Sequence, residues 1–546
     1  MSQSRFPKGL FFLVFTEFWE RFGYYLMIGI FMLYMTADQE KGGFGWDNAK
    51  GADVYGTFIA LVFLTPFMGG LLADLKLGYR FSISLGGILM GIGYCMLAIP
   101  SETTFYFALG TMVIGNGLFK PNISALLGNL FNDDRYRHKK DTGYNLFYMG
   151  INLGAFVCTF VAALMRNKIG WHAAFISAGV GMFIGVITFW AGMKHYRHVD
   201  LRKEPNAEDK PVLKQFFKVL LVGLVFAFIG WMIPGTVMGS DSTDSFFMFC
   251  IPVIYFYAYI YFKSPAEDKK PLGTMYTVFV IVILFWAIFK QNGSALTTYA
   301  EFYTDREVPE ILAPATKAMG FSDPLVAQNG KVTQYDEQFR KLKDENGEVK
   351  KCLDYPVYFK NLSPAKYPEP GGSINLLNTE IFQSINPFFV ISLTPLIIAL
   401  FSFMRNKGKE PTTASKIALG LLISALSTLV MVAAVHYTNN GMDKASAWWL
   451  ISAYGVITIG ELCLSPMGLS MVSKLSPMRL TALMMGGWYL STSIGNKLSG
   501  VLAKNWDKFD NKANYFWLNF ALLLLAFLIM MLVLKRLNKV FNESAH

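Results

Sequence analysis

The chain has 546 residues, of which 53% are hydrophobic, 16% aromatic and only 16% charged. Soluble domains usually carry about 25% charged residues, and the mean hydropathy of +0.36 is that of a membrane protein. The same composition excludes a disordered chain, collagen and a coiled coil. The net charge of +11 does not indicate nucleic-acid binding, because Lys and Arg lie in short loops between apolar runs and report orientation in a membrane.

Apolar runs of about 20 residues, the length that spans a bilayer, predict fourteen helices in groups of six, two and six. They lie near 9–35, 51–74, 80–99, 103–128, 141–165, 171–195, 213–238, 244–262, 272–303, 378–404, 413–436, 444–474, 477–505 and 513–535. This grouping predicts an all-α integral membrane protein of the major facilitator plan, with two six-helix bundles around a midplane cavity. The bundles are expected at 1–195 and 271–546, with a basic linker and an accessory two-helix hairpin at 196–270.

The loop charges predict the orientation. With a cytoplasmic N-terminus, the inside segments hold 25 Lys and Arg residues and the short outside loops hold 8. This bias supports a multi-pass protein of the plasma membrane, most simply a bacterial inner membrane, with both termini cytoplasmic. The first apolar run is too long for a cleavable signal peptide. The polar, proline-containing insert 304–377 falls outside. It could be a small ordered cap or a loop, and we favour a loop with little structure of its own.

Ionisable side chains inside spanning helices are costly and therefore indicate function. Glu17, Glu20 and Arg21 are spaced i, i+3 and i+4 in the first helix, so they share one face. Because Arg21 stays charged while one carboxylate can titrate, the group can handle a proton. A static ion network is the alternative.

Other polar side chains also interrupt the apolar runs. They are Lys120, Tyr148, Asn152, Trp286, Lys290, Glu461, Ser465 and Trp488. Lys120 needs a carboxylate partner, which the glutamates of the first helix are expected to supply. Tyr148 and Asn152 can bind a polar substrate or join helices. Cations in one half and Glu461 in the other suit a zwitterion. Lys497, seven residues before Lys504, is expected to reach outward to the interface.

At these residues the sequence resembles the proton-coupled oligopeptide transporter family of the major facilitator superfamily. The resemblance rests on six blocks in order along nearly the whole chain apart from 304–377, and the extra helix pair is similar to that of bacterial members. The blocks are Glu17-x-x-Glu20-Arg21-Phe22-x-Tyr24-Tyr25, GGLLADLKLGYR, GNGLFKPN, FYMGINLGA, FWAIF-x-QNGS and GELCLSPMGL.

The resemblance implies a proton-coupled symporter that imports di- and tripeptides by alternating access. Glu17, Glu20, Arg21 and Lys120 would form the proton-coupling network, and Glu461 would bind the amino group of the peptide. Other residues would line the substrate pocket: Tyr24, Tyr25, Tyr148, Asn152, Trp286, Lys290, Ser465 and Trp488. No cofactor is expected beyond the proton gradient, and the protein is expected to work as a monomer in the lipid bilayer.

One salt bridge of the family is changed at both ends. The family usually has an Arg where this chain has Ile28, and an acidic residue where it has Lys290. Lys290 could replace the Arg as the anchor of the peptide carboxylate, less strictly than a guanidinium fork would. The substrate could instead be a modified peptide or another organic anion, or Lys290 could simply pair with Glu461 or another acid.

Three other classes compete with a transporter. An intramembrane enzyme would need a nucleophile with its base, paired aspartates or a metal set within the helices, and none is visible in the sequence. A channel would need a selectivity-filter segment. A sensor on the same fold is the third class, although the chain retains the coupling residues. All six histidines look loop-borne or terminal, so no histidine proton step is expected.

Overall fold

The computed structural model describes residues 6–544 apart from 132, 134, 137–139, 201–208, 346 and 477–479. Part of the basic linker, and Arg5, Arg137, Lys139 and Arg479 among the predicted inside charges, lie outside the described residues. The described part contains fourteen helices of 18 or more residues, one for each predicted run, which confirms the expected fold class. They are α1 (Lys8–Thr36), α2 (Asn48–Leu72), α3 (Tyr79–Met96), α4 (Glu102–Leu130), α5 (Lys140–Lys168), α6 (Trp171–Gly192), α7 (Asp209–Met232), α8 (Asp241–Lys263), α9 (Ala266–Phe289), α12 (Ile385–Asn406), α13 (Thr413–Tyr437), α14 (Ala447–Leu475), α15 (Thr481–Lys504) and α16 (Lys512–Ser544).

Nine described segments are long and apolar enough to cross a membrane by composition alone. Helices such as α1 and α15 do not reach the hydropathy expected of a membrane span, because they carry polar side chains. Those side chains point into the protein. In α15 the buried polar residues are Ser491, Thr492, Ser493, Asn496, Lys497 and Ser499. Large apolar side chains instead face outward, as at Phe262 and Leu532, which are 71% and 84% exposed. This inside-out polarity is that of a multi-pass membrane protein.

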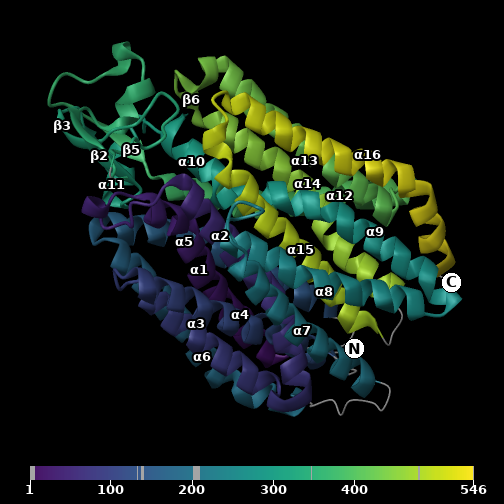
Figure 1. Cartoon of the computed structure of the whole chain (residues 1–546). Coiled ribbons are helices and arrows are strands. Elements are labelled where there is room, and N and C mark those ends of the chain that lie inside the picture. The colour runs from purple at the N-terminus through teal and green to yellow at the C-terminus, as the bar shows by residue number, and fades with distance from the viewer. Residues whose placement is uncertain are drawn as a thin grey trace.

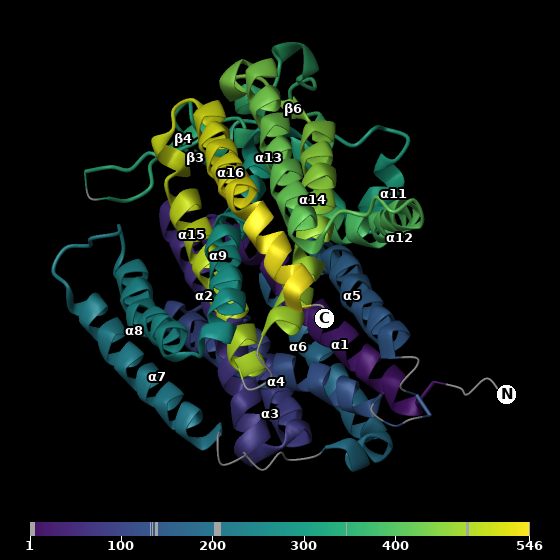
Figure 2. The same ribbon diagram turned by 90° about the vertical axis from the view of Figure 1, so that its right-hand side faces the viewer.

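The helices form two groups with a pair beside them. Helices α1–α6 make one bundle, and α9 with α12–α16 makes the other (Figure 2). Helices α7 and α8 pack on each other beside α2 and α15 (Figure 1). The hairpin shares an apolar core with the second bundle, and the Tyr257 hydroxyl donates to the carbonyl of Leu483 at 2.8 Å. The predicted domain boundaries stay predictions.

The bundles meet closely along α2 and α15. A Cβ on Gly56 would lie 2.6 Å from the Cα of Gly500, so both backbones approach without side chains between them. We call the end of the molecule that carries the insert 304–377 the insert face. There Arg166 of α5 lies 2.9 Å from Glu380, before α12. Close packing and an ion pair thus join the two bundles at the insert face.

The insert has structure of its own, so the expectation of an irregular loop is wrong. It contains α11 (Ala313–Ala318) and strands β1 (Thr304–Asp305), β2 (Ser322–Val326), β3 (Gly330–Thr333), β4 (Lys351–Asp354) and β5 (Ser373–Leu377). The pairs β2–β5 and β3–β4 are antiparallel, and β1 runs parallel to β6 (Ala445–Ser446). A small apolar cluster lies beneath them: Ala327, Tyr358, Phe359, Leu362, Ile374 and Leu376. Sequence patterning missed these strands because they are too short to show an alternation.

The insert touches both bundles. Its Lys341 ammonium donates to the carbonyl of Thr36 at 2.7 Å, at the C-terminal end of α1 in the first bundle. Its Arg340 guanidinium lies 3.2 Å from the carboxylate of Asp510, in the loop before α16. The insert therefore bridges the two bundles rather than projecting freely.

Candidate functional site

The charged residues of α1 form one buried cluster. The Arg21 guanidinium holds the Glu20 carboxylate through both of its oxygens, with Nη2 donating to Oε1 at 2.5 Å. The same guanidinium lies 3.5 Å from Glu17 Oε1. It also lies over the ring of Tyr24, 5.0 Å from the centroid. The second oxygen of Glu17 has no hydrogen-bond partner among the described residues, so Glu17 is the more weakly held carboxylate.

Lys120 does not make the predicted pair with the α1 glutamates. Its ammonium has no carboxylate within 4.0 Å in the described part of the chain, and lies 4.2 Å from the ring centroid of Phe63 in α2. Lys290 approaches the same ring at 5.1 Å. Phe63 therefore contacts two cations. The sequence gives no sign of this role, because an isolated Phe in an apolar run is ordinary.

A cavity of about 160 Å³ lies between the two bundles. It brings together six predicted substrate-binding residues, from α1, α5, the end of α9 and α14: Tyr24, Tyr25, Tyr148, Asn152, Lys290 and Glu461. Ile28 lines the same cavity. Its apolar side chain leaves the α1 wall uncharged at the position where the resemblance led us to look for an arginine.

Lys290 and Glu461 are the charged residues that line this cavity. Lys290 follows the last residue of α9, where the helix gives way to a tight turn over 290–293 before α10 (Ala295–Phe302). Neither Lys290 nor Glu461 makes an ion pair within 4.0 Å among the residues described. Glu461 Oε2 instead accepts from Asn386 Nδ2 at 3.2 Å. An unpaired cation and an unpaired anion on one cavity wall can hold a ligand that carries both charges.

Three predicted substrate-binding residues lie outside the cavity lining. Trp488 is buried against Phe279 within the second bundle. Trp286 packs against Phe285 and Phe289, and its indole stands 5.8 Å from the Lys290 ammonium. Ser465, one turn after Glu461, is also absent from the lining residues. Their place in the binding site stays a prediction.

Several cavity residues were missed by the sequence reasoning. Gln383 and Asn386 lie before and at the start of α12, three residues apart, and they share the lining with Tyr55, Asn292 and Thr159. Asn386 Nδ2 also donates to Thr458 at 2.9 Å, so it is fixed against α14. The sequence does carry a signal for Gln383 and Asn386. They are two amides spaced i and i+3 at the point where a polar segment passes into an apolar helix. No group of metal-ligating side chains occurs in the described residues.

Comparison with known proteins adds to this geometry. Residues 80–317 and 371–518 match the model of the POT family, over half of the chain. The chain belongs to the POT family. A di-/tripeptide transporter of Lactococcus lactis subsp. lactis is 27% identical over 98% of this chain and 97% of its own length. A peptide transporter of Yersinia enterocolitica is 28% identical over 90% of this chain and 86% of its own.

Solved POT structures agree with the fold. A peptide transporter crystallised with sulfate superposes with a TM-score of 0.75 at 28% identity, covering 98% of this chain and 96% of the other. Family and structural relatives are peptide transporters rather than enzymes. The family match leaves out 318–370, which is most of the insert.

Proposed function

We propose that this POT-family protein imports short peptides, of two or three residues, together with protons. The observation that carries the proposal is the cavity between the bundles, in which Lys290 and Glu461 have no ion-pair partner among the described residues. A peptide zwitterion would place its carboxylate at Lys290 and its amino group at Glu461. The names of the relatives, which transport di- and tripeptides, support the same substrate class.

The proton would be handled by the cluster of Glu17, Glu20, Arg21 and Lys120. Arg21 is shared between two carboxylates, and it binds Glu20 more closely than Glu17. Protonation of Glu17 would leave the Arg21–Glu20 pair intact and change the charge of the cluster by one unit. Lys120, without a carboxylate partner among the described residues, is free to respond to that change.

Transport would proceed by alternating closure of the two bundles around the cavity. The insert face would be the outside of the cell and both termini would be cytoplasmic, in a bacterial inner membrane. Helix α1 reaches the insert with its last residue, Thr36, and α16 runs away from the insert toward its own C-terminal end (Figure 1), which is compatible with that orientation. Closure at the insert face then makes this structure an inward-facing or occluded state. A single chain contains the whole cavity, so a monomer would suffice.

A second candidate keeps the fold and the proton coupling but changes the substrate. Ile28 and Lys290 replace the two residues that the resemblance leads us to expect, so among the described residues that line the cavity the cation is a lysine rather than an arginine. An ammonium is less selective for carboxylate geometry than a guanidinium fork. A modified peptide or another organic anion would then bind in place of a simple peptide.

Uptake into proteoliposomes separates the two candidates. Purified protein would be given a labelled dipeptide under an inward proton gradient, with and without an uncoupler. Accumulation that the uncoupler abolishes would support proton-driven peptide import. Protein that stays folded and binds another organic anion, yet takes up no peptide, would favour the second candidate.

The coupling cluster makes a separate prediction. Glu17→Gln should abolish accumulation against a gradient while peptide exchange between preloaded vesicles and medium continues, because exchange needs no net proton movement. Glu102→Gln is the matched control, since Glu102 is about half exposed and pairs with Lys50 away from the cavity. Unchanged accumulation by Glu17→Gln would count against a role of Glu17 in coupling.

A further inference from the structure

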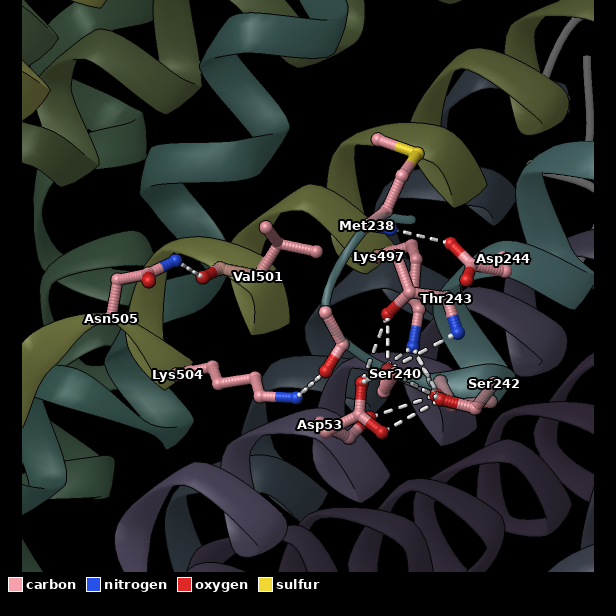
Figure 3. Close-up of polar contacts among 12 residues, drawn as sticks. Asp53, Met238, Ser240, Ser242, Thr243, Asp244, Lys497, Val501, Lys504 and Asn505 are labelled. Carbon is pink, nitrogen blue, oxygen red and sulfur yellow. Dashed lines mark hydrogen bonds and ion pairs between the residues drawn. The ribbon is translucent and has the colours of Figure 1, made fainter. Parts of the chain in front are cut away.

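A buried ion pair joins the two bundles to the accessory hairpin at the insert face (Figure 3). The Lys497 ammonium of α15 donates to Asp53 Oδ1 of α2 at 2.9 Å. The start of α8 closes over this pair. Ser240 donates to Asp53 Oδ1 at 2.8 Å, Thr243 to the same oxygen at 3.1 Å, and Ser242 to Oδ2 at 2.7 Å. The expectation that Lys497 reaches outward to the interface is therefore wrong.

The pair is buried and its hydrogen bonds are complete. The Lys497 side chain is 1% exposed and that of Asp53 is 14% exposed. The three donors of the ammonium go to Asp53, to Thr57 at 2.5 Å and to Ser242 at 3.0 Å. A buried ion pair is stable only when its remaining donors and acceptors are satisfied. Among the described residues, every hydroxyl that donates to the Asp53 carboxylate comes from the hairpin.

The turn that presents these hydroxyls is itself fixed. The Asp244 carboxylate accepts from the backbone N–H groups of Val237 and Met238, at 2.8 and 2.7 Å. Lys504 of α15 donates to the carbonyl of Gly239. The Asp53 carboxylate also lies at the N-terminus of α8, where the helix dipole favours a negative charge. Hydroxyls, dipole and turn together hold Asp53 where Lys497 can reach it.

We propose that the accessory hairpin α7–α8 is a third component of the gate at the insert face. Ser240 and Ser242 act as positioning residues that keep Asp53 and Lys497 paired, and so stabilise the state closed at that face. This role rests on the proposed function, in which the protein alternates between a state closed at the insert face and a state open there. Because α8 shares its apolar core with the second bundle, opening would carry the hydroxyls away with α15 and leave Asp53 on α2.

The test compares the hairpin with the ion pair. Spin labels would be placed through unnatural amino acids at Thr103 of the first bundle and Lys508 of the second, both exposed, and their distance distribution measured in nanodiscs. The double variant S240A/S242A should raise the ratio of the longer to the shorter distance roughly tenfold or more, because two hydrogen bonds to a charged group are lost. Lys497→Ala should shift the distribution in the same direction.

Ser264→Ala is the matched control, since Ser264 ends the same helix and its hydroxyl donates only within α8, to Ile260. It should leave the distribution unchanged. A shift with Lys497→Ala but none with S240A/S242A would overturn the role of the hairpin. No shift with either folded variant would overturn the gate itself. Peptide uptake by the wild type is measured separately. Failure of the proposed transport function would therefore be distinguishable from failure of the proposed gate.

Discussion

The anchoring role of Lys290 can be tested by replacing it with methionine, which keeps the length and apolar bulk of the side chain. In the structure the ammonium lines the cavity with Ile28 and Glu461, and no acidic group within 4.0 Å neutralises it in the described part of the chain. It is therefore available to a substrate carboxylate. Lys290→Met should weaken the binding of a dipeptide with a free C-terminus.

The expected size follows from the contact that is lost. A hydrogen bond to a charged group contributes about 1.5–3 kcal/mol, and about 1.4 kcal/mol corresponds to a tenfold change in Kd. Dipeptide affinity should therefore fall roughly tenfold to 150-fold. The lower end applies if Lys120, whose ammonium also lies near the Phe63 ring, takes over part of the contact.

The assay compares two ligands on two proteins. Binding of Ala-Ala and of its C-terminal amide would be measured by calorimetry on wild type and on Lys290→Met. The amide lacks the negative charge, so the substitution should weaken Ala-Ala far more than the amide. Lys407→Met controls for loss of a lysine, because Lys407 lies over Phe403 away from the cavity. Equal Ala-Ala affinity in wild type and Lys290→Met would refute the anchor.

Two further predictions concern regions outside the cavity. Lys341→Ala should speed protease cleavage within the insert, because its nearly buried ammonium holds the carbonyl of Thr36, whereas Lys343→Ala, at a half-exposed pair, should change little. The Arg405 guanidinium lowers the pKa of Glu410 to about 2, so this carboxylate stabilises the fold above pH 4.5 and progressively less as the pH falls toward 2. Tm measured from pH 7 to 3 should therefore fall less steeply in Glu410→Gln than in wild type, and parallel curves would contradict this.

The helices were predictable because each needs about 20 apolar residues, and that length is visible in one sequence. The residue at which α9 ends was not predictable from the sequence. The predicted run 272–303 treats it as one helix, whereas the chain forms a tight turn over 290–293 and then α10. Gly293 in this turn has no room for a side chain, because a Cβ would lie 1.8 Å from the Tyr55 hydroxyl. That constraint comes from another helix, which local patterning does not contain.

Partners distant in sequence explain the errors about single charges. Lys497 looked able to reach the interface because Lys504 lies two turns away, but its partner Asp53 lies 444 residues earlier in the chain. The sequence suggests the α1 glutamates as partners of Lys120 because they are the obvious carboxylates inside a predicted helix. In the structure Arg21 already binds both oxygens of Glu20. Residue types and spacing identify the charges that matter, whereas their pairing requires the three-dimensional structure.

The buried charged residues fall into two groups, those that form an ion pair and those that do not. Asp53 with Lys497 and Arg166 with Glu380 form ion pairs that join the bundles at the insert face. Lys290 and Glu461 face the cavity without such a partner among the described residues. An unpaired charge in a membrane interior destabilises the protein, so stability alone would favour apolar residues at both positions. Under the proposed function, a ligand with one carboxylate and one ammonium would neutralise both charges at once. The free energy lost by leaving the two charges unpaired would then favour zwitterionic substrates.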